Sequence, residues 1–471
     1  MLTSNVSENI TVLREKVEKT ADFMVRDIYI GNIRVSFVMF EGMVSLSVLA
    51  NLIIRPLLNG IDDSATSEEI ADFIINKSLM AADMKEVKTF DEVIKMAVSG
   101  FAVVLIDGVK TGIALGAQGF NFRSVTEPSG EINERGSREG FTEPLKINLT
   151  MIRRRVKSGA LKIEMGETGE ESKTDYALVY MNADKRLIDE IKKRLSKVKI
   201  KTVLDTGYIE PFLQSKRGSI FSSVGVTERP DTLVAKITEG RVAVLLDGTP
   251  FALIVPYLFS ENFQSFDDYA QRPFFASFVR VLKYVSFFFT IYLPGIYVAL
   301  STFHPETLPH ALLFNIASAE EATPFPLVLS ALIIHLIYEI MREAGLRLPR
   351  PVGHAVGIVG ALVIGDAAVT AGLIGSPMVM VVALTAISSF VVPSLYAPVS
   401  ILRFVMIIAG GLTGIYGISI LSGMVIINIC SVENFGVCYT SPITPFKWSA
   451  MRDTFIRIGW KKMQKREGKI R

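Results

Sequence analysis

Apolar and polar residues are unevenly distributed along this chain, and the longest apolar stretch covers residues 350–409. Between Pro351 and Val432 the only formally charged side chains are Asp366 and Arg403. A helix that spans a bilayer needs about 20 mostly apolar residues. The pattern therefore predicts a membrane domain in the C-terminal half of the chain.

The apolar stretch divides into segments of membrane-spanning length. Residues 356–374 and 378–395 are the first two, and Gly375, Ser376 and Pro377 predict a tight turn between them. A further apolar segment follows at residues 401–429.

Two apolar segments precede these. Residues 285–300 predict a first span, which Pro294 is expected to kink. Residues 325–341 are apolar but contain Glu339, so they predict either a span with functional charges or a helix at the interface. Together the segments predict four to six crossings.

The first 265 residues are richer in charge and predict two soluble α/β subdomains. We expect subdomain 1 at residues 1–120, a linker at 121–144 and subdomain 2 at 145–265. Both contain the same hairpin signal, a β-branched run followed by Asp-Gly, at Asp107-Gly108 and at Asp247-Gly248. The shared hairpin suggests a structural repeat. The predicted fold is thus an α/β N-terminal region followed by an α-helical polytopic membrane domain at residues 266–443.

The last segment, residues 444–471, is basic. Trp448, Met451, Phe455 and Ile458 fall on one stripe if the segment is helical. This predicts an amphipathic helix at the cytoplasmic leaflet, where anionic lipids attract Lys and Arg. No short apolar core follows a basic start at the N-terminus, so no signal peptide is expected, and the N-terminal region and the tail are both predicted to be cytoplasmic.

Composition narrows the function further. The net charge of +3 gives no reason to expect nucleic-acid binding. Two cysteines and four scattered histidines suggest neither a disulfide framework nor a metal site. No phosphate-binding loop, zinc-protease motif or nucleophile elbow occurs. We expect no cofactor and no enzymatic activity.

Three acidic residues in or near the apolar region are candidates for an ion path. Asp366 lies within an apolar segment, where a carboxylate is costly unless it faces protein or water. Glu339 and Glu343 are four residues apart and share a helical face, where they could line a path or pair with nearby arginines. Candidate packing or gating residues are small or helix-breaking: Gly357, Gly360, Pro377 and Pro393.

Several long motifs carry a resemblance to a known family. They are RGSREGFTE at 135–143, TERPD at 227–231, EGRVAVLLDGTPF at 239–251 and REAGLRLP at 342–349. In this order they resemble the A subunit of the spore germinant receptor, the GerA family, from about Gly31 onward. The related stage V sporulation protein AF-like group shares the architecture. The chain departs from the expected pattern at His354, where a glutamine or another polar residue was expected.

The resemblance implies an integral protein of the endospore inner membrane. It implies two partners, a transporter-like B subunit that binds the nutrient and a lipoprotein C subunit. It also implies a homo-oligomeric ring, a pentamer, that releases monovalent cations when nutrient is sensed. Glu339, Glu343 and Asp366 would then lie near the cation path, because acidic rings favour cations.

Two other functions stay open. One is a solute transporter or permease with Asp366 near the midplane of the membrane. The other is a non-conducting scaffold that gathers partners through its soluble region.

Overall fold

The computed structural model describes residues 1–17, 20–62, 64–76, 84–117, 127–128, 130–215, 218–348, 365–446 and 451–463. Gly357 and Gly360 lie outside these described residues. The chain folds into two compact units. Among the described residues, unit 1 comprises 1–215 and 224–257, and unit 2 comprises 218–223 and 258–463.

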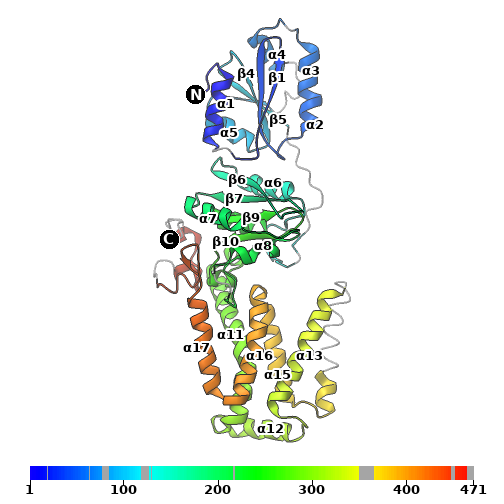
Figure 1. Ribbon diagram of the computed structural model, residues 1–471, viewed down its shortest axis with the longest axis vertical. Coiled ribbons are helices and arrows are strands. Elements are labelled where there is room, and N and C mark those ends of the chain that lie inside the picture. Colours follow the sequence, from blue (N-terminus) through cyan, green and yellow to red (C-terminus); the bar gives the residue numbers. More distant parts are fainter. Residues whose placement is uncertain are drawn as a thin grey trace. The chain divides into compact units, whose positions relative to one another are not determined.

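Unit 1 begins with an α/β lobe, here called lobe 1 (residues 1–117; Figure 1). Its five strands form one antiparallel sheet in the order β1-β2-β4-β5-β3. The elements are α1 (Val6–Lys16), β1 (Phe23–Ile30), β2 (Ile33–Phe40), α2 (Leu46–Leu49), η1 (Ala50–Ile54), α3 (Arg55–Gly60), α4 (Ser67–Asn76), β3 (Met84–Val87), α5 (Phe90–Ala97), β4 (Phe101–Ile106) and β5 (Gly112–Gly116).

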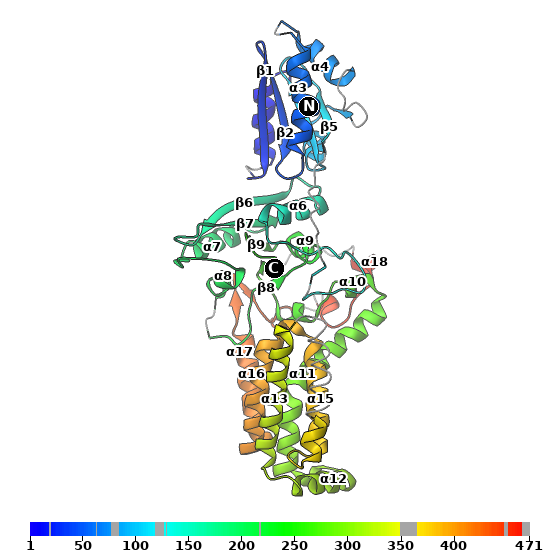
Figure 2. The same cartoon turned by 90° about the vertical axis from the view of Figure 1, so that its right-hand side faces the viewer.

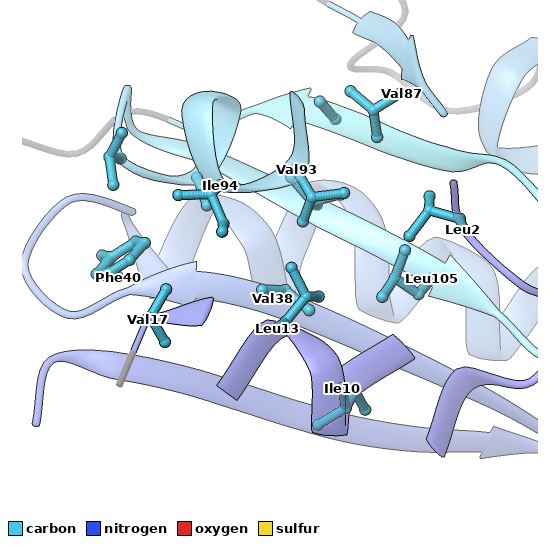
Figure 3. Packing of buried hydrophobic residues seen from close by; sticks show 14 of the residues in the cluster. Leu2, Ile10, Leu13, Val17, Val38, Phe40, Val87, Val93, Ile94 and Leu105 are labelled. Atoms are coloured by element: carbon cyan, nitrogen blue, oxygen red, sulfur yellow. The ribbon is translucent and has the colours of Figure 1, made fainter. Parts of the chain in front are cut away.

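Both faces of this sheet are buried, because side chains of a strand alternate between its faces. Val38 of β2 packs with α1 and α5, whereas its neighbours Phe37 and Met39 pack with the α2–α4 helices. Figure 3 shows Leu13 of α1 and Val93 of α5 against Val38. Lobe 1 is therefore a three-layer sandwich.

Lobe 2 (residues 130–215 and 224–257) repeats this topology. Its antiparallel sheet has the order β6-β7-β9-β10-β8, which is the order of lobe 1 with every strand number raised by five. The elements are α6 (Leu145–Arg155), β6 (Leu161–Thr168), β7 (Thr174–Met181), α7 (Lys185–Leu195), α8 (Thr206–Leu213), β8 (Gly225–Thr227), α9 (Pro230–Thr238), β9 (Val242–Leu246) and β10 (Ala252–Val255).

The Asp-Gly turns hold the same bonds in both lobes. The Asp107 carboxylate accepts the N–H of Val6 at the start of α1, and the Asp247 carboxylate accepts the N–H of Leu145 at the start of α6. Gly108 and Gly248 both have φ near +90°, which glycine tolerates best. The repeat suggested by the shared hairpin thus extends to the whole lobe.

Unit 2 is a helical bundle (Figure 2). Its longest helix, α11, continues through Pro294 for 31 residues. The elements are η3 (Phe259–Phe263), α10 (Asp267–Ala270), α11 (Pro273–Phe303), η4 (Pro305–Thr307), α12 (His310–Glu321), α13 (Leu327–Arg347), α15 (Ser376–Phe390), η5 (Pro393–Leu395), α16 (Tyr396–Thr413), α17 (Ile415–Cys430), β11 (Glu433–Asn434), β12 (Val437–Cys438), η6 (Met451–Asp453) and α18 (Trp460–Met463). Residues 365–370 are also helical.

Two expectations need correction here. The helical unit 2 begins at residue 258 and not at 266, because Phe259 and Phe263 pack with Phe287 in its core. The apolar segment 401–429 is not one helix: Gly414, with φ +65°, separates α16 from α17. Residues 304–322, which lie between the first two predicted spans, contain α12.

The basic tail also differs from the expected amphipathic helix. Of its described residues, only 451–453 and 460–463 form short helical turns. The reason lies in its contacts: Asp453 accepts a bond from buried Arg280 of α11, and the Arg457 N–H donates to Ser277. These contacts fix the segment against α11 in a non-helical path.

Helix ends in unit 2 gather in two groups. At the α12 end, Gly414 lies against Phe303, and Gly375 lies against Ala319. At the opposite end, here called the tail end, Tyr439 stacks edge-on against Phe259. Among the described residues, two helical segments, Pro273–Phe303 and Pro393–Thr413, are long and apolar enough to cross a membrane. Ser376–Phe390 and Ile415–Cys430 are apolar but shorter. The polytopic count of four to six crossings stays a prediction.

Candidate functional site

The helices of unit 2 enclose a charged pair. Glu339 lies on α13, and Arg403 lies in the middle of α16 with a fully buried side chain. The Glu339 Oε1 atom is 3.4 Å from Nη1 of Arg403. A buried guanidinium without a counter-charge is strongly destabilising, so the carboxylate compensates a charge that α16 carries into an apolar bundle.

One face of α16 supplies the side-chain partners that Glu339 has among the described residues. The Tyr396 hydroxyl donates to Oε2 at 2.5 Å, and the Ser400 hydroxyl donates to Oε1 at 2.8 Å. Tyr396, Ser400 and Arg403 are spaced by four and then three residues, which places them on the same side of a helix. The carboxylate is thus held by three donors from a single neighbouring helix.

Arg403 also ties this pair to α11. Its Nε donates to the backbone carbonyl of Thr290 at 3.2 Å. In an uninterrupted helix that carbonyl would accept the N–H of residue 294, but Pro294 has none. The proline expected to kink the span therefore leaves a carbonyl free, and the buried arginine occupies it.

Polar and aromatic side chains surround the pair. The Arg403 guanidinium lies 5.8 Å from the ring centre of Tyr338, whose hydroxyl is 3.3 Å from Oγ of Ser389 on α15. Arg342 stacks over the ring of Tyr396 at 3.2 Å. His335 is fully buried, and its Nε2 atom has no hydrogen-bond partner among the residues that the structure describes.

The backbones of α11 and α16 approach closely near this site. A methyl group added at Gly295 would lie 2.6 Å from the carbonyl oxygen of Met406, and one added at Gly410 would collide with the carbonyl of Gly295. Glycine at both positions allows the contact. The close packing places Arg403 within reach of the Thr290 carbonyl.

The three acidic residues expected near an ion path are not brought together. Glu343 is exposed and pairs with Arg347 at 2.6 Å, as its spacing suggested. Asp366 is exposed in the helical residues 365–370, and its carboxylate has no hydrogen bond or ion pair within the described parts of the chain. Pro377 begins α15, and Pro393 begins the short η5 turn before α16.

Arg403 belongs to this site but was not among the candidates chosen from the sequence. The sequence left open whether Glu339 lines a path or pairs with nearby arginines; its arginine partner in the structure is on α16, 64 positions away. A signal was available, because Arg403 is the only Lys or Arg between Pro351 and Val432. Among the described residues, no group of three or more His, Cys, Asp or Glu could hold a metal ion.

Known proteins match this chain along nearly its whole length. The family model described as Bacillus/Clostridium GerA spore germination protein matches residues 11–469. The chain belongs to the GerA spore germination protein family. GerA relatives include spore germination protein KA of Bacillus subtilis (strain 168), 38% identical over 99% of this chain and 87% of the relative.

Two further relatives of this chain, from the same organism, match it over most of their own length. Spore germination protein B1 is 35% identical over 97% of this chain and 95% of its own length. The uncharacterized membrane protein YfkQ is 38% identical over 99% and 91%. A crystal structure of the N-terminal domain of the A subunit of the Bacillus megaterium spore germinant receptor GerK3 covers 55% of this chain and 97% of that one, at 27% identity and a TM-score of 0.44.

Proposed function

We propose that this protein is the A subunit of a nutrient germinant receptor in the spore inner membrane, and that it forms an oligomeric, ligand-gated channel for monovalent cations. It would act with a transporter-like B subunit and a lipoprotein C subunit. The family match over residues 11–469 carries the germination role. The two long apolar helices and the Glu339–Arg403 pair, whose arginine is fully buried, support a membrane part with a polar contact between its helices.

The geometry suggests separate roles for the acidic residues. Glu339 is occupied by Tyr396, Ser400 and Arg403, so its carboxylate is not available to a passing cation in this arrangement. We assign Glu339 to a contact between α13 and α16, formed with Tyr396, Ser400 and Arg403 and here called the lock. Glu343 and Asp366 are exposed on their helices and are the remaining candidates for the cation path.

Potassium efflux from liposomes tests this proposal. The purified chain, alone and with the B and C subunits, is reconstituted with potassium inside, and efflux is followed with and without candidate nutrients. Nutrient-dependent efflux is expected only from the assembly. Folded, assembled protein that never passes potassium would instead favour the scaffold, and solute uptake by the chain alone would favour the transporter.

Matched variants separate the lock from the path. Glu339→Gln weakens the tie to Arg403 and is expected to raise efflux without nutrient. Neutralising a path residue, by Asp366→Asn or Glu343→Gln, is expected to lower nutrient-dependent efflux, because a ring of carboxylates attracts cations. Equal efflux from all three variants and the parent would remove both assignments.

A further inference from the structure

The two lobes of unit 1 meet where a corner of lobe 1, residues 20–22, docks on the edge of the lobe 2 sheet. The Thr20 hydroxyl donates to the carbonyl of Ile163 and accepts the N–H of the same residue, both at 3.1 Å. The Ala21 N–H donates to that carbonyl at 3.0 Å. Strand β6 is an edge strand, and this corner satisfies backbone groups that would otherwise stay unpaired.

A buried ion pair completes the same contact. The Asp22 carboxylate accepts from Nη2 of Arg153 at 2.6 Å and from Nε at 3.1 Å, and the arginine side chain is 2% exposed. The guanidinium also lies 4.6 Å from the ring centre of Phe40. The docked corner is therefore recognised by two features, a hydroxyl residue at the strand edge and a carboxylate two positions later.

The duplication identifies the corresponding surface on lobe 1. Asn9 and Asn148 make the same bonds, since each side chain accepts an N–H and donates to the carbonyl of the residue six positions earlier. Five residues after each asparagine comes an arginine, Arg14 in α1 and Arg153 in α6. Lobe 1 therefore carries the counterpart of the arginine that binds the docked carboxylate.

The strand edge has its counterpart as well. Val25 is the third residue of β1, and Ile163 is the third residue of β6. Both strands are eight residues long and lie at the edge of their sheet, and the first residue of each pairs with the last residue of the next strand. In lobe 1 this position is open: Arg14 is exposed, and within the described residues the backbone N–H and carbonyl of Val25 make no hydrogen bond to a segment outside the sheet. Tyr29, further along β1, is 63% exposed.

We propose that this open acceptor of lobe 1, formed by Arg14 and the outer edge of β1 at Val25, docks a partner protein. The segment that fits presents a hydroxyl residue followed two positions later by a carboxylate, as Thr20 and Asp22 do within this chain. In lobe 1 the residue directly before β1 is Asp22, whereas in lobe 2 the residue directly before β6 is Ala160. The corresponding corner of lobe 2 in a second copy therefore lacks the carboxylate. The occupant is therefore a different chain, and the inference rests on the proposed function in taking the companion subunits as its source.

Cysteine labelling in the assembled receptor tests this surface. Cys430 and Cys438 are first changed to serine, and then Thr11→Cys or Tyr29→Cys is introduced beside the acceptor, with Glu68→Cys on the exposed face of α4 as control. Labelling by a maleimide is compared between the purified chain and its assembly with the B and C subunits. We expect the assembly to slow labelling at Thr11→Cys and Tyr29→Cys by about tenfold, because labelling follows the unbound fraction. The control should not change.

A charge reversal shows whether Arg14 makes the contact. In the assembly, adding Arg14→Glu should restore labelling at Thr11→Cys, whereas Arg14→Lys should retain most of the protection. Unchanged labelling in a stable, efflux-competent assembly overturns the surface and leaves the proposed function standing. Protection in the chain alone that grows with its concentration overturns the partner in favour of a second copy, and failure of the B and C subunits to co-purify overturns both proposals.

Discussion

At the scale of single residues, Glu339 and Arg403 form the arrangement with the largest expected energetic consequence. Glu339→Gln would leave the fully buried guanidinium without its counter-charge, and breaking one side of a buried pair costs about 3–5 kcal/mol. We expect a clear fall in the unfolding temperature in detergent. Adding Arg403→Met should recover much of the loss, because the stranded charge is then removed.

Glu343→Gln is the matched control for this prediction. Its partner Arg347 is exposed, and an exposed pair contributes about 0–1 kcal/mol. An equal loss of stability in Glu343→Gln and Glu339→Gln would contradict the buried tie between α13 and α16.

A second residue-scale prediction concerns Glu139 in lobe 2. Burial alone would raise the pKa of its carboxyl group, but hydrogen bonds and charges from Arg154 and Arg155 outweigh burial and lower the pKa below its usual value. The stabilisation is therefore complete above the unfolded-state pKa and is lost as pH falls through the folded-state pKa. The free energy of unfolding of the full chain, measured between about pH 6 and pH 3, should fall less steeply with pH in Glu139→Gln than in the parent protein. Parallel curves for the two proteins would refute this role.

At the scale of elements, the close contact between α11 and α16 depends on two glycines. Gly410→Ala would place a methyl group against the backbone carbonyl of Gly295, which cannot move without separating the helices. Overpacking of this kind costs about 1–3 kcal/mol. Thermal unfolding in detergent should therefore shift downward.

Gly423→Ala in α17 provides the comparison. A methyl group there meets no atom of the described residues within 4 Å, so the change should be neutral or stabilise the helix by up to about 1 kcal/mol. A destabilisation of Gly423→Ala as large as that of Gly410→Ala would show that the effect does not come from the helix contact.

Sequence pattern predicted the elements of this protein better than their pairings. The Asp-Gly hairpins, the α/β character of unit 1 and the apolar helices of unit 2 follow from local periodicity and turn chemistry. The tie between Glu339 and Arg403 does not, because it depends on which helices become neighbours. The tail shows the same limit. The spacing of its apolar residues is typical of an amphipathic helix, but the contact of Asp453 with buried Arg280 holds the segment in a different conformation.

At the scale of the whole molecule, repetition organises unit 1. The strand order, the Asp-Gly turns and the helix starts recur in lobe 2. One shared hairpin was visible in the sequence because a turn needs specific residues. The rest was hidden, since a sheet tolerates many apolar side chains at its buried positions.

Unit 2 makes a prediction about sidedness. The chain enters it at Leu258 and leaves α17 at Cys430, both at the tail end, whereas α12 lies at the opposite end. At about 1.5 Å per residue, the 31 residues of α11 exceed the roughly 30 Å of a bilayer's hydrocarbon core. Cys430 and an exposed position on α12 such as Phe314 should therefore face opposite sides of the membrane.

An impermeant maleimide applied to sealed vesicles tests this arrangement. With Cys438→Ser in both proteins, the native Cys430 is compared with Phe314→Cys in a Cys430→Ser background. We expect one of the two to react in sealed vesicles and both to react after detergent is added. Glu68→Cys should label with Cys430 if the N-terminal region and the tail are both cytoplasmic. Reaction of both Cys430 and Phe314→Cys in sealed vesicles would mean that α11 does not cross the bilayer. The Glu339–Arg403 pair would then belong to a bundle that lies on the membrane and cannot gate a path through it.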